Sequence, residues 1–217
     1  MGKTIKIDLH THSILSRDGG INLEQYEQLF RNGTIDVAAI TDHNEISFAV
    51  DAHKKLGDRI IVGEEIMTTD GEVIGLFLME KVPSHLSLAE TIAHIKKQGG
   101  IVYVPHPFET IRKGLDEAVL LKHIKDIDII ETANGRAFLQ DASKQAYSFA
   151  KKHKKTGAAG SDSHCKHGVG NTYATLSSIP GRNNFLELFA NASLCDKRMN
   201  ILHAFCPQIN RIKKLLI

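Results

Sequence analysis

Short apolar runs recur along the chain, and the segments between them carry apolar residues at helical spacing. The runs at residues 5–9, 35–41, 59–62 and 101–104 have the length and the Ile and Val content that are typical of buried strands. Between the first two runs, apolar residues at intervals of three and four over 22–33 predict an amphipathic helix. The alternation of strand and helix continues toward the C-terminus. This order predicts an α/β fold with a parallel sheet, either open or closed into a barrel.

Helix boundaries are marked by residues with known capping roles. Asn22 and Gln25 match a capping box at the start of the first predicted helix, and Ser87 and Glu90 match a second one. Both are followed by apolar residues at helical spacing. A longer helix is expected over about 139–152, where apolar residues share one side. These signals predict helices that pack through one face.

The chain is expected to form one domain over residues 1–217, because it contains no linker, repeat or low-complexity segment. The residues at 70–71 favour a hairpin turn before an apolar run at 73–79. Near the C-terminus, a helix that follows Pro207 has an apolar face beside basic residues. We expect the C-terminal helical segment, about 196–217, to pack on the barrel rather than to contact a membrane or a partner.

The composition is that of an ordinary soluble globular protein, with 42% hydrophobic residues, 24% charged residues and a net charge of +2. It gives no strong signal for a nucleic-acid or membrane surface. No apolar run has spanning length and no signal peptide precedes the first strand, so we expect a cytoplasmic protein. The three cysteines form no Cys-x-x-Cys pair, which favours a reducing compartment over a disulfide framework. Histidine is the exception, because a count of 12 is high for this length.

The first strand carries two of these histidines. Side chains two residues apart share one face of a strand, so Asp8, His10 and His12 are expected to point the same way. Ile7 and Leu9 point to the other face and are expected to pack beneath helices. Two histidines at this spacing can bind a single cation, and the nearby carboxylate can orient one of them. The first strand therefore predicts part of a metal site.

Histidines and carboxylates recur just past the C-terminal ends of the predicted strands. Strand ends of this kind meet at one rim of an α/β barrel, so these residues are expected to converge in one pocket. Any single histidine among them could be a hydrogen-bonded core residue, but their recurrence at the same end of the strands argues for a shared site. The residues are His10, His12, Asp18, His43, Glu65, His106, Asp162 and His164.

This set of residues indicates a site with more than one metal ion. Imidazole and carboxylate ligands without thiolate suit Zn²⁺, Mn²⁺ or Fe²⁺. The set is larger than the three or four ligands that a protein gives to one catalytic ion, so we expect two or three divalent ions bridged by carboxylates and hydroxide. Such clusters serve the hydrolysis of phosphate esters, because the ions generate hydroxide at neutral pH and stabilise charge on the attacking and leaving oxygens.

Five motifs that carry these residues resemble those of the PHP (polymerase and histidinol phosphatase) family. In chain order they read Asp-Leu-His-Thr-His-Ser, Thr-Asp-His-Asn, Gly-Glu-Glu, Val-Pro-His-Pro and Gly-Ser-Asp-Ser-His, and the resemblance runs from residue 5 to about 175. It implies a distorted (β/α)7 barrel with a two- or three-metal site at the C-terminal ends of the strands, and phosphoesterase activity. By position it assigns metal ligation to all the residues of the set above. The candidates for direct roles in catalysis are His10, His12, Asp162 and His164.

The chain departs from the family pattern at one position. Glu72, three residues before Gly75, stands where many members have a histidine. A glutamate can still bind a metal ion, so Glu72 is kept as a candidate ligand, with a turn residue as the alternative. Glu131 and Asn134 resemble a further family signature, but strand parity lets only one of them face inward.

Substrate binding requires positively charged side chains that do not serve as metal ligands. Arginines lie in loops beside the motifs, and Arg can bind phosphate through two hydrogen bonds. A histidine three residues after His164 is a further candidate. Cys165 is expected to be a packed small residue rather than a nucleophile, since a metal site already supplies hydroxide. In order of preference, the candidates for binding the substrate phosphate are Arg112, Arg136, Arg17 and His167.

The leading interpretation is a phosphoesterase that hydrolyses a small phosphomonoester or nucleotide by metal-activated hydroxide. One alternative is a phosphodiesterase or nuclease acting on short oligonucleotides, which the near-neutral net charge mildly disfavours. Another is a non-catalytic, metal-binding regulatory module, which the departure at Glu72 leaves open. The natural substrate and the metal are not determined by the residues, because a shared site does not identify the molecule that it cleaves.

Overall fold

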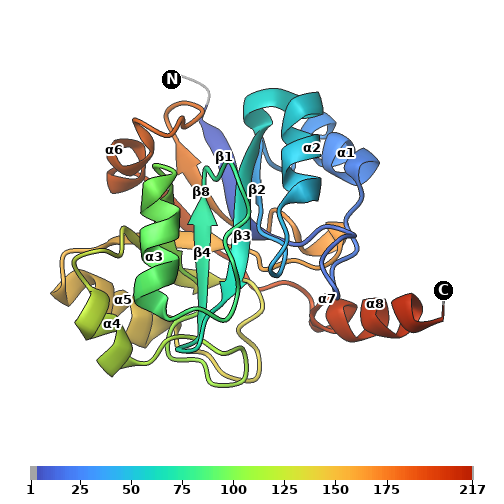
Figure 1. Cartoon of the computed structure of the whole chain (residues 1–217). Coiled ribbons are helices and arrows are strands. Elements are labelled where there is room, and N and C mark those ends of the chain that lie inside the picture. The colour runs from blue at the N-terminus through green and yellow to red at the C-terminus, as the bar shows by residue number, and fades with distance from the viewer. Residues whose placement is uncertain (1–3, 217) are drawn as a thin grey trace.

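The computed structural model describes residues 4–216; residues 1–3 and Ile217, which the predicted domain and C-terminal segment include, lie outside it. Within 4–216, nine strands form one sheet in the order β7-β6-β5-β4-β3-β2-β1-β8-β9 (Figure 1). The strands are β1 (Ile5–Thr11), β2 (Val37–Ile40), β3 (Ile60–Met67), β4 (Glu72–Leu76), β5 (Ile101–Val104), β6 (Ile129–Asn134), β7 (Thr156–Gly160), β8 (Thr172–Leu176) and β9 (Ser193–Asp196).

Helices lie around the outside of this sheet, with α1 and α2 on one side and α3 to α5 on another (Figure 1). Two 3-10 turns, η1 (Gly57–Arg59) and η2 (Lys166–Gly168), lie in connections. The helices are α1 (Leu23–Arg31), α2 (Ser47–Leu56), α3 (Leu88–Lys97), α4 (Glu117–His123), α5 (Ser143–Lys152), α6 (Phe185–Ala190), α7 (Ile201–Ala204) and α8 (Cys206–Leu215).

The first seven strands close into a barrel-like sheet. At the end of β1, Thr11 forms a parallel bridge with Ser163, and the amide of His12 donates to the Ser163 carbonyl at 2.9 Å. The pairing is parallel within β1–β3 and within β5–β7, whereas β4 is antiparallel to both of its neighbours. Strands β8 and β9 extend the sheet from β1, also antiparallel. The predicted α/β barrel is confirmed, with the hairpin at β3–β4 as its main distortion.

Two apolar layers hold the barrel together. In β2, Val37 and Ala39 belong to an inner cluster to which strands on every side of the barrel contribute. The alternate residues Ala38 and Ile40 belong to an outer cluster that includes the buried faces of α1 to α5. Phe185 of α6 joins the inner cluster, and α6 lies at the end of the sheet near the start of β1 (Figure 1). The candidate site residues lie at the opposite end of the barrel.

The apolar side chains of the first strand point to a different side from the one predicted. Ile7 and Leu9 lie in the inner cluster and not beneath helices, so that expectation was wrong. The register of β1 against β2 shifts between Asp8 and Thr11. This irregularity breaks the simple alternation, so His10 can turn toward the mouth of the barrel although Leu9 faces its interior.

The helix signals agree with the structure at both capping boxes. Asn22 caps α1 with Gln25, and Ser87 caps α3 with Glu90, and both reciprocal hydrogen bonds are present in each case. The predicted helix over 139–152 instead begins at Ser143 as α5. Residues before it belong to a loop, because the Gln140 side chain is bonded to the 108–111 segment and Asp141 accepts from the Ser143 amide.

The cysteines also differ from the prediction. Cys165 and Cys206 form a disulfide with a Cα–Cα distance of 6.1 Å, and Cys195 is free. The expectation of a chain without a disulfide, and of Cys165 as a packed small residue, was therefore wrong. The fold brings the turn after β7 against the start of α8, which are 41 residues apart in sequence. Spacing along the chain gives no sign of this approach.

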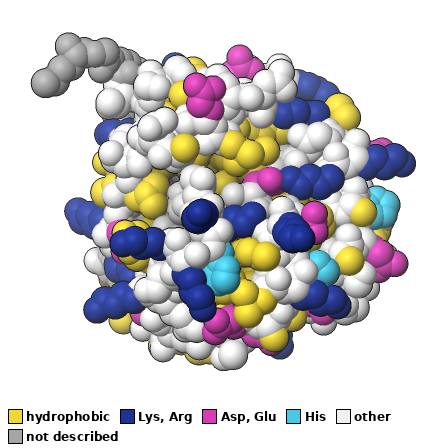
Figure 2. All heavy atoms as spheres, turned by 90° about the vertical axis from the view of Figure 1, so that its left-hand side faces the viewer, with side chains coloured by type: hydrophobic (Ala, Val, Ile, Leu, Met, Phe, Trp, Pro, Cys, Tyr) yellow, Lys and Arg dark blue, Asp and Glu magenta, His cyan; other side chains and the backbone are white. Residues whose placement is uncertain are grey.

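The surface is mixed in charge where Figure 2 shows it. On that face, Lys and Arg side chains are spread among acidic, apolar and neutral ones and do not form a single continuous band. No helix within residues 4–216 is long and apolar enough to cross a membrane.

Candidate metal centre

The predicted ligands gather at the end of the barrel where the parallel strands finish. Strand β4 runs in the opposite direction, so its first residue, Glu72, reaches the same rim as the last residues of its neighbours. The amide of Asn44 donates to the Glu65 carbonyl and the amide of Glu65 to the Asp42 carbonyl, which extends β2 and β3 toward the site. The residues brought together are His10, His12, Asp18, His43, Glu65, Glu72, His106, Asp162 and His164.

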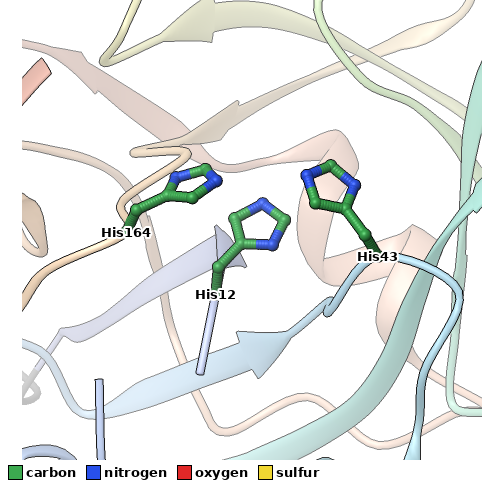
Figure 3. A group of neighbouring side chains, drawn as sticks. All are labelled: His12, His43 and His164. Carbon is green, nitrogen blue, oxygen red and sulfur yellow. The ribbon is translucent and has the colours of Figure 1, made fainter. Parts of the chain in front are cut away.

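Three histidines from distant parts of the chain lie face to face at the mouth. His12 follows β1, His43 follows β2 and His164 follows β7, and their rings point toward one another (Figure 3). The ring centroid of His12 lies 4.1 Å from that of His164 and 4.7 Å from that of His43. Each ring offers a nitrogen, and the three nitrogens lie within 4.8 Å of one another. This spacing suits ligation of one cation by three imidazoles.

The remaining ligands form further groups that share members with the first. Each group has potential ligand atoms within 4.8 Å of one another, so the groups form one continuous cluster rather than separate sites. Glu65 and His10 each belong to two groups, and a shared carboxylate can bridge two ions. The groups are His10, His106 and Asp162; His10, His12 and Glu65; and His43, Glu65 and Glu72.

Asp18 lies at the edge of this cluster. Its Oδ1 is 3.3 Å from His164 Nε2 and 3.6 Å from His43 Nε2, so it adjoins the three-histidine group. Its Oδ2 accepts a hydrogen bond from Arg211 of α8 at 2.6 Å. Nearby imidazoles lower the pKa of Asp18 far below its usual range despite burial. The carboxylate is therefore ionised and available to a cation.

Several buried histidine nitrogens have no hydrogen-bond partner, and this bears on whether the residues fit metal ions. Buried polar atoms are nearly always hydrogen-bonded, because an unpaired one costs about 1–3 kcal/mol. Within residues 4–216, Nε2 of His10, both ring nitrogens of His12 and Nε2 of His164 are buried and have no hydrogen-bond partner. They point into a cluster that also holds ionised carboxylates. The donor set therefore fits divalent cations such as Zn²⁺, Mn²⁺ or Fe²⁺.

The protonation states of the outer histidines favour metal binding. Burial lowers the pKa of His43 to about 4. Burial, together with His12 and Arg136, lowers the pKa of His164 to about 3. Both imidazoles are thus neutral near pH 7, and the neutral form is the one that ligates a metal.

Glu72 shows the opposite electrostatic effect. Burial raises its pKa to about 9, and the charges of Glu65 and Asp162 add to the shift. Its Oε1 lies 3.6 Å from His43 Nδ1, and its Oε2 lies 3.8 Å from His106 Nε2. A cation shared with these neighbours would displace the proton, because ligation requires the carboxylate form. Glu72 is thus placed as a ligand is, and not as a solvated turn residue.

The backbone is strained at two of the candidate ligands. His106 has a φ of 27° and Asp162 a φ of 52°, a region that non-glycine residues rarely adopt. Such conformations cost on the order of 1–3 kcal/mol each and persist only when the surroundings enforce them. At His106, the backbone amide donates to Glu131 Oε2 at 2.7 Å. The strain turns both side chains into the cluster.

Glu131 and Asn134 both face the site, so the expectation that only one could do so was wrong. The register of β6 against β7 shifts between Glu131 and Ala133, which is a bulge that changes the side-chain parity. Asn134 Nδ2 donates to Glu131 Oε2 at 2.8 Å. A regular strand would have placed them on opposite faces.

Glu131 holds His10 in position rather than standing among the ligand groups. Its Oε1 lies 3.2 Å from His10 Nδ1 and also accepts from the Tyr103 hydroxyl. This arrangement fixes the His10 ring with Nε2 directed into the cluster. Burial lowers the pKa of His10, but the carboxylates of Asp162, Glu65 and Glu131 outweigh it and raise that pKa well above its usual value. The surroundings of His10 thus attract positive charge.

A cavity of about 600 Å³ opens over the cluster, and arginines line it. Arg112 Nη1 donates to Asp162 Oδ2 at 2.5 Å, and Arg136 Nη1 donates to Asp162 Oδ1 at 3.0 Å. Arg17, which is an exposed residue, also lines this cavity. His167 does not, because it lies exposed on η2 with its ring stacked on His203. The structure therefore brings three of the four predicted phosphate-binding residues to the cavity.

The C-terminal helix supplies cavity residues that the sequence analysis missed. Gln208 and Arg211 of α8 line the cavity. Asn210 donates to the carbonyl oxygens of Asp18 and His164 at 2.9 Å each. Lys214 donates to the carbonyls of residues 14, 16 and 19. The only sequence signal was the polar face of the helix, which does not indicate what that face contacts.

The chain is similar to a described family and to two known proteins. Residues 140–192 match a family described as PHP-associated. An uncharacterized protein of Methanocaldococcus jannaschii, MJ0417, is 35% identical over 182 residues, which cover 81% of this chain and 72% of that one. A second uncharacterized protein of the same organism, MJ1587, is 38% identical over 143 residues, covering 60% of this chain and 82% of that one.

A solved structure shares the fold. It is a two-domain protein from Bacteroides vulgatus that contains a predicted PHP-like metal-dependent phosphoesterase. The TM-score is 0.73 at 18% identity, and the match covers 90% of this chain and 66% of that chain. This chain thus spans just under two thirds of that protein, and at this identity the likeness concerns the fold.

Proposed function

The chain belongs to the PHP family, and we propose that it is a metal-dependent phosphoesterase that hydrolyses a small phosphomonoester with two or three divalent ions. One observation supports this most: buried imidazole nitrogens without hydrogen-bond partners in residues 4–216 converge with carboxylates beneath a cavity lined by arginines. Such a site offers metal ligands and phosphate-binding cations within one small space.

The chain's contribution to metal chemistry is to hold the ions. When bound, Zn²⁺, Mn²⁺ or Fe²⁺ supply hydroxide near neutral pH and stabilise charge on phosphoryl oxygens. His12, His43 and His164 would hold one ion, and the groups built on His10 and Glu65 would hold the others. The buried rings have little freedom to reorient, so the ligands are arranged before an ion or a substrate arrives.

The arginines are placed to bind the phosphoryl group. Arg112 and Arg136 both donate to Asp162, one to each carboxylate oxygen. A phosphoryl group beside Asp162 would meet Nη1 of both guanidinium groups, while the Nε and Nη2 edge of Arg112 already donates to Glu109. Arg17 forms no ion pair with any residue among 4–216 and is a third cation at the rim. These cations lower the free energy of a transition state whose charge lies on the phosphoryl oxygens.

The size of the cavity favours a small substrate. Its volume of about 600 Å³ lies in the range of small-molecule sites. An oligonucleotide would need an extended basic groove along its backbone. A phosphodiesterase acting on short oligonucleotides and a non-catalytic metal-binding module are the two other outcomes that the experiment distinguishes.

The test is phosphate release by protein loaded separately with Mn²⁺, Fe²⁺ or Zn²⁺. We expect hydrolysis of p-nitrophenyl phosphate and of phosphorylated metabolites, and little cleavage of bis(p-nitrophenyl) phosphate. His10→Gln should abolish turnover, whereas His94→Gln, which changes an exposed histidine of α3, should leave it unchanged. Preferential cleavage of the diester would favour the phosphodiesterase. Metal uptake without hydrolysis of any ester would favour the regulatory module.

A further inference from the structure

A second hollow of about 170 Å³ opens beside the metal cavity. Its wall comes from three segments that are far apart in sequence: the loop before α4, the loop between β6 and α5, and the helices α7 and α8. Ile111, Arg112, Arg136 and Gln208 line both hollows. The two hollows are therefore adjacent, and the two arginines that hold Asp162 form the border between them.

Away from this border most of the wall is apolar, although Glu109 and Gln140 also line it. Phe138, Leu139, Ile201 and Phe205 contribute side chains to it. Leu139 is 88% exposed and Phe205 is 54% exposed. Several large apolar side chains left open around one concave site mark a place where an apolar group binds.

The hollow is held in shape by hydrogen bonds across its loops. Gln140 accepts from the Thr110 amide at 2.9 Å and donates to the Phe108 carbonyl at 3.3 Å, which joins two of the three segments. Arg198, three residues before α7, donates to the Ala137 carbonyl at 2.7 Å and to Asp141 at 2.9 Å, which ties the chain leading into α7 to the loop between β6 and α5. A site that is already formed loses little entropy when a ligand enters it.

The arrangement of charge selects the kind of molecule that can occupy both hollows. The metal cavity and the border arginines favour an anionic group, whereas the second hollow favours an apolar group a few ångströms away. The volume is that of a compact group rather than of a long chain. Two phenylalanines in the wall favour an aromatic ring, because aromatic pairs add about 0.5–1.5 kcal/mol to simple burial.

Resting on the proposed phosphoesterase function, we propose that this second hollow binds the leaving group of the substrate, and that the substrate is a phosphomonoester with an aromatic leaving group. We call it the leaving-group pocket. In this arrangement the phosphoryl group lies at the arginine border and the ring lies against Phe138, Leu139, Ile201 and Phe205.

The test measures binding separately from turnover. Phenylphosphonate and methylphosphonate carry the same anionic group, and neither is hydrolysed. Titration of the Mn²⁺-loaded protein should show phenylphosphonate binding about tenfold more tightly, as expected for burial of a ring. The double variant Leu139→Ser with Ile201→Ser should lose this preference, and binding of methylphosphonate should not change.

A matched control shows whether the position of the change matters. Leu121→Ser replaces another exposed leucine, on α4, that lines neither hollow. It should keep the preference for phenylphosphonate. Equal affinity of the wild-type protein for both phosphonates, or equal losses for both in the double variant, would overturn the pocket assignment.

Turnover separates this inference from the proposed function. If the wild-type protein hydrolyses phenyl phosphate and glycerol 2-phosphate, the double variant should lower kcat/KM only for the aryl ester. Hydrolysis of both esters without any loss in the variant would overturn the leaving-group pocket while the phosphoesterase function stands. A phenylphosphonate preference that the variant removes, without hydrolysis of any ester, would keep the pocket and overturn the function.

Discussion

The metal centre and the leaving-group pocket share two arginines but are built from different parts of the chain. Most candidate ligands of the metal centre follow strand ends of a nearly closed barrel, and most are buried. The leaving-group pocket is formed by two loops and by the C-terminal helices, and its apolar side chains are open to solvent. Strand ends fix atoms firmly, whereas loops tolerate exchange of their side chains. We therefore expect the barrel to determine the reaction and the loops to determine which leaving group is accepted.

The largest effect should come from a change within the metal centre. Asp162→Ala removes a ligand candidate and the anion that holds Arg112 and Arg136. We expect kcat to fall by about 10³-fold or more, because electrostatic groups at a reacting centre have effects of this order. Turnover with p-nitrophenyl phosphate measures this, and circular dichroism checks that the fold is kept. Near-full activity of this variant with fresh metal would contradict the claim that the metal centre determines the reaction.

The disulfide joins the two regions, and its removal should affect one more than the other. Cys165 follows the ligand His164, and Cys206 begins α8 beside Phe205. In Cys206→Ser, we expect the free energy of unfolding to fall by about 2–4 kcal/mol, as is typical for loss of a native cross-link. The preference for phenylphosphonate should weaken, while hydrolysis of glycerol 2-phosphate should persist.

Chemical denaturation and phosphonate titration measure these two effects. Cys195→Ser is the control, because Cys195 is the free cysteine of the chain. If the Cys206→Ser variant lost all hydrolysis but still bound phenylphosphonate more tightly than methylphosphonate, the assignment of α8 to the leaving-group pocket would be wrong.

A smaller effect is expected at a glycine that supports the metal centre. A Cβ at Gly160 would lie 2.5 Å from His10 Cβ and 2.5 Å from Glu131 Oε1. Gly160→Ala should therefore destabilise the fold by about 1–3 kcal/mol, as overpacking commonly does, and should weaken metal binding by displacing His10. Thermal unfolding with and without Mn²⁺ measures both. Gly181→Ala, where an added Cβ would lie 3.7 Å from the nearest atom, Asn184 Oδ1, should be close to neutral.

The barrel and the ligand positions could be predicted because they follow from local patterns. A strand that leads to a histidine has an alternation and an apolar run that are visible in sequence, as in the segment leading to His43. Capping boxes such as Asn22 with Gln25 involve residues three apart and were predicted for the same reason. The convergence of the ligands required only the rule that parallel strands end at one rim.

The features that were not predicted depend on contacts between distant residues. The bulge in β6 lets Glu131 and Asn134 face the same side, and no local sequence signal marks it. The contacts of Asn210 with residues 18 and 164 depend on where α8 packs, which spacing does not encode. The disulfide depends on the same packing. Sequence periodicity therefore predicted where the candidate ligands lie, but it did not predict the pocket for the leaving group.

The most direct test of the metal centre is anomalous X-ray diffraction from crystals of the Mn²⁺-loaded protein. The account predicts two or three manganese peaks at the mouth of the barrel, within ligand distance of His12, Glu65 and Asp162. Two-metal sites of this kind typically hold their ions about 3.5–4 Å apart, and neighbouring peaks should show that spacing. No peak at the barrel mouth, or peaks only on the outer surface, would contradict the account.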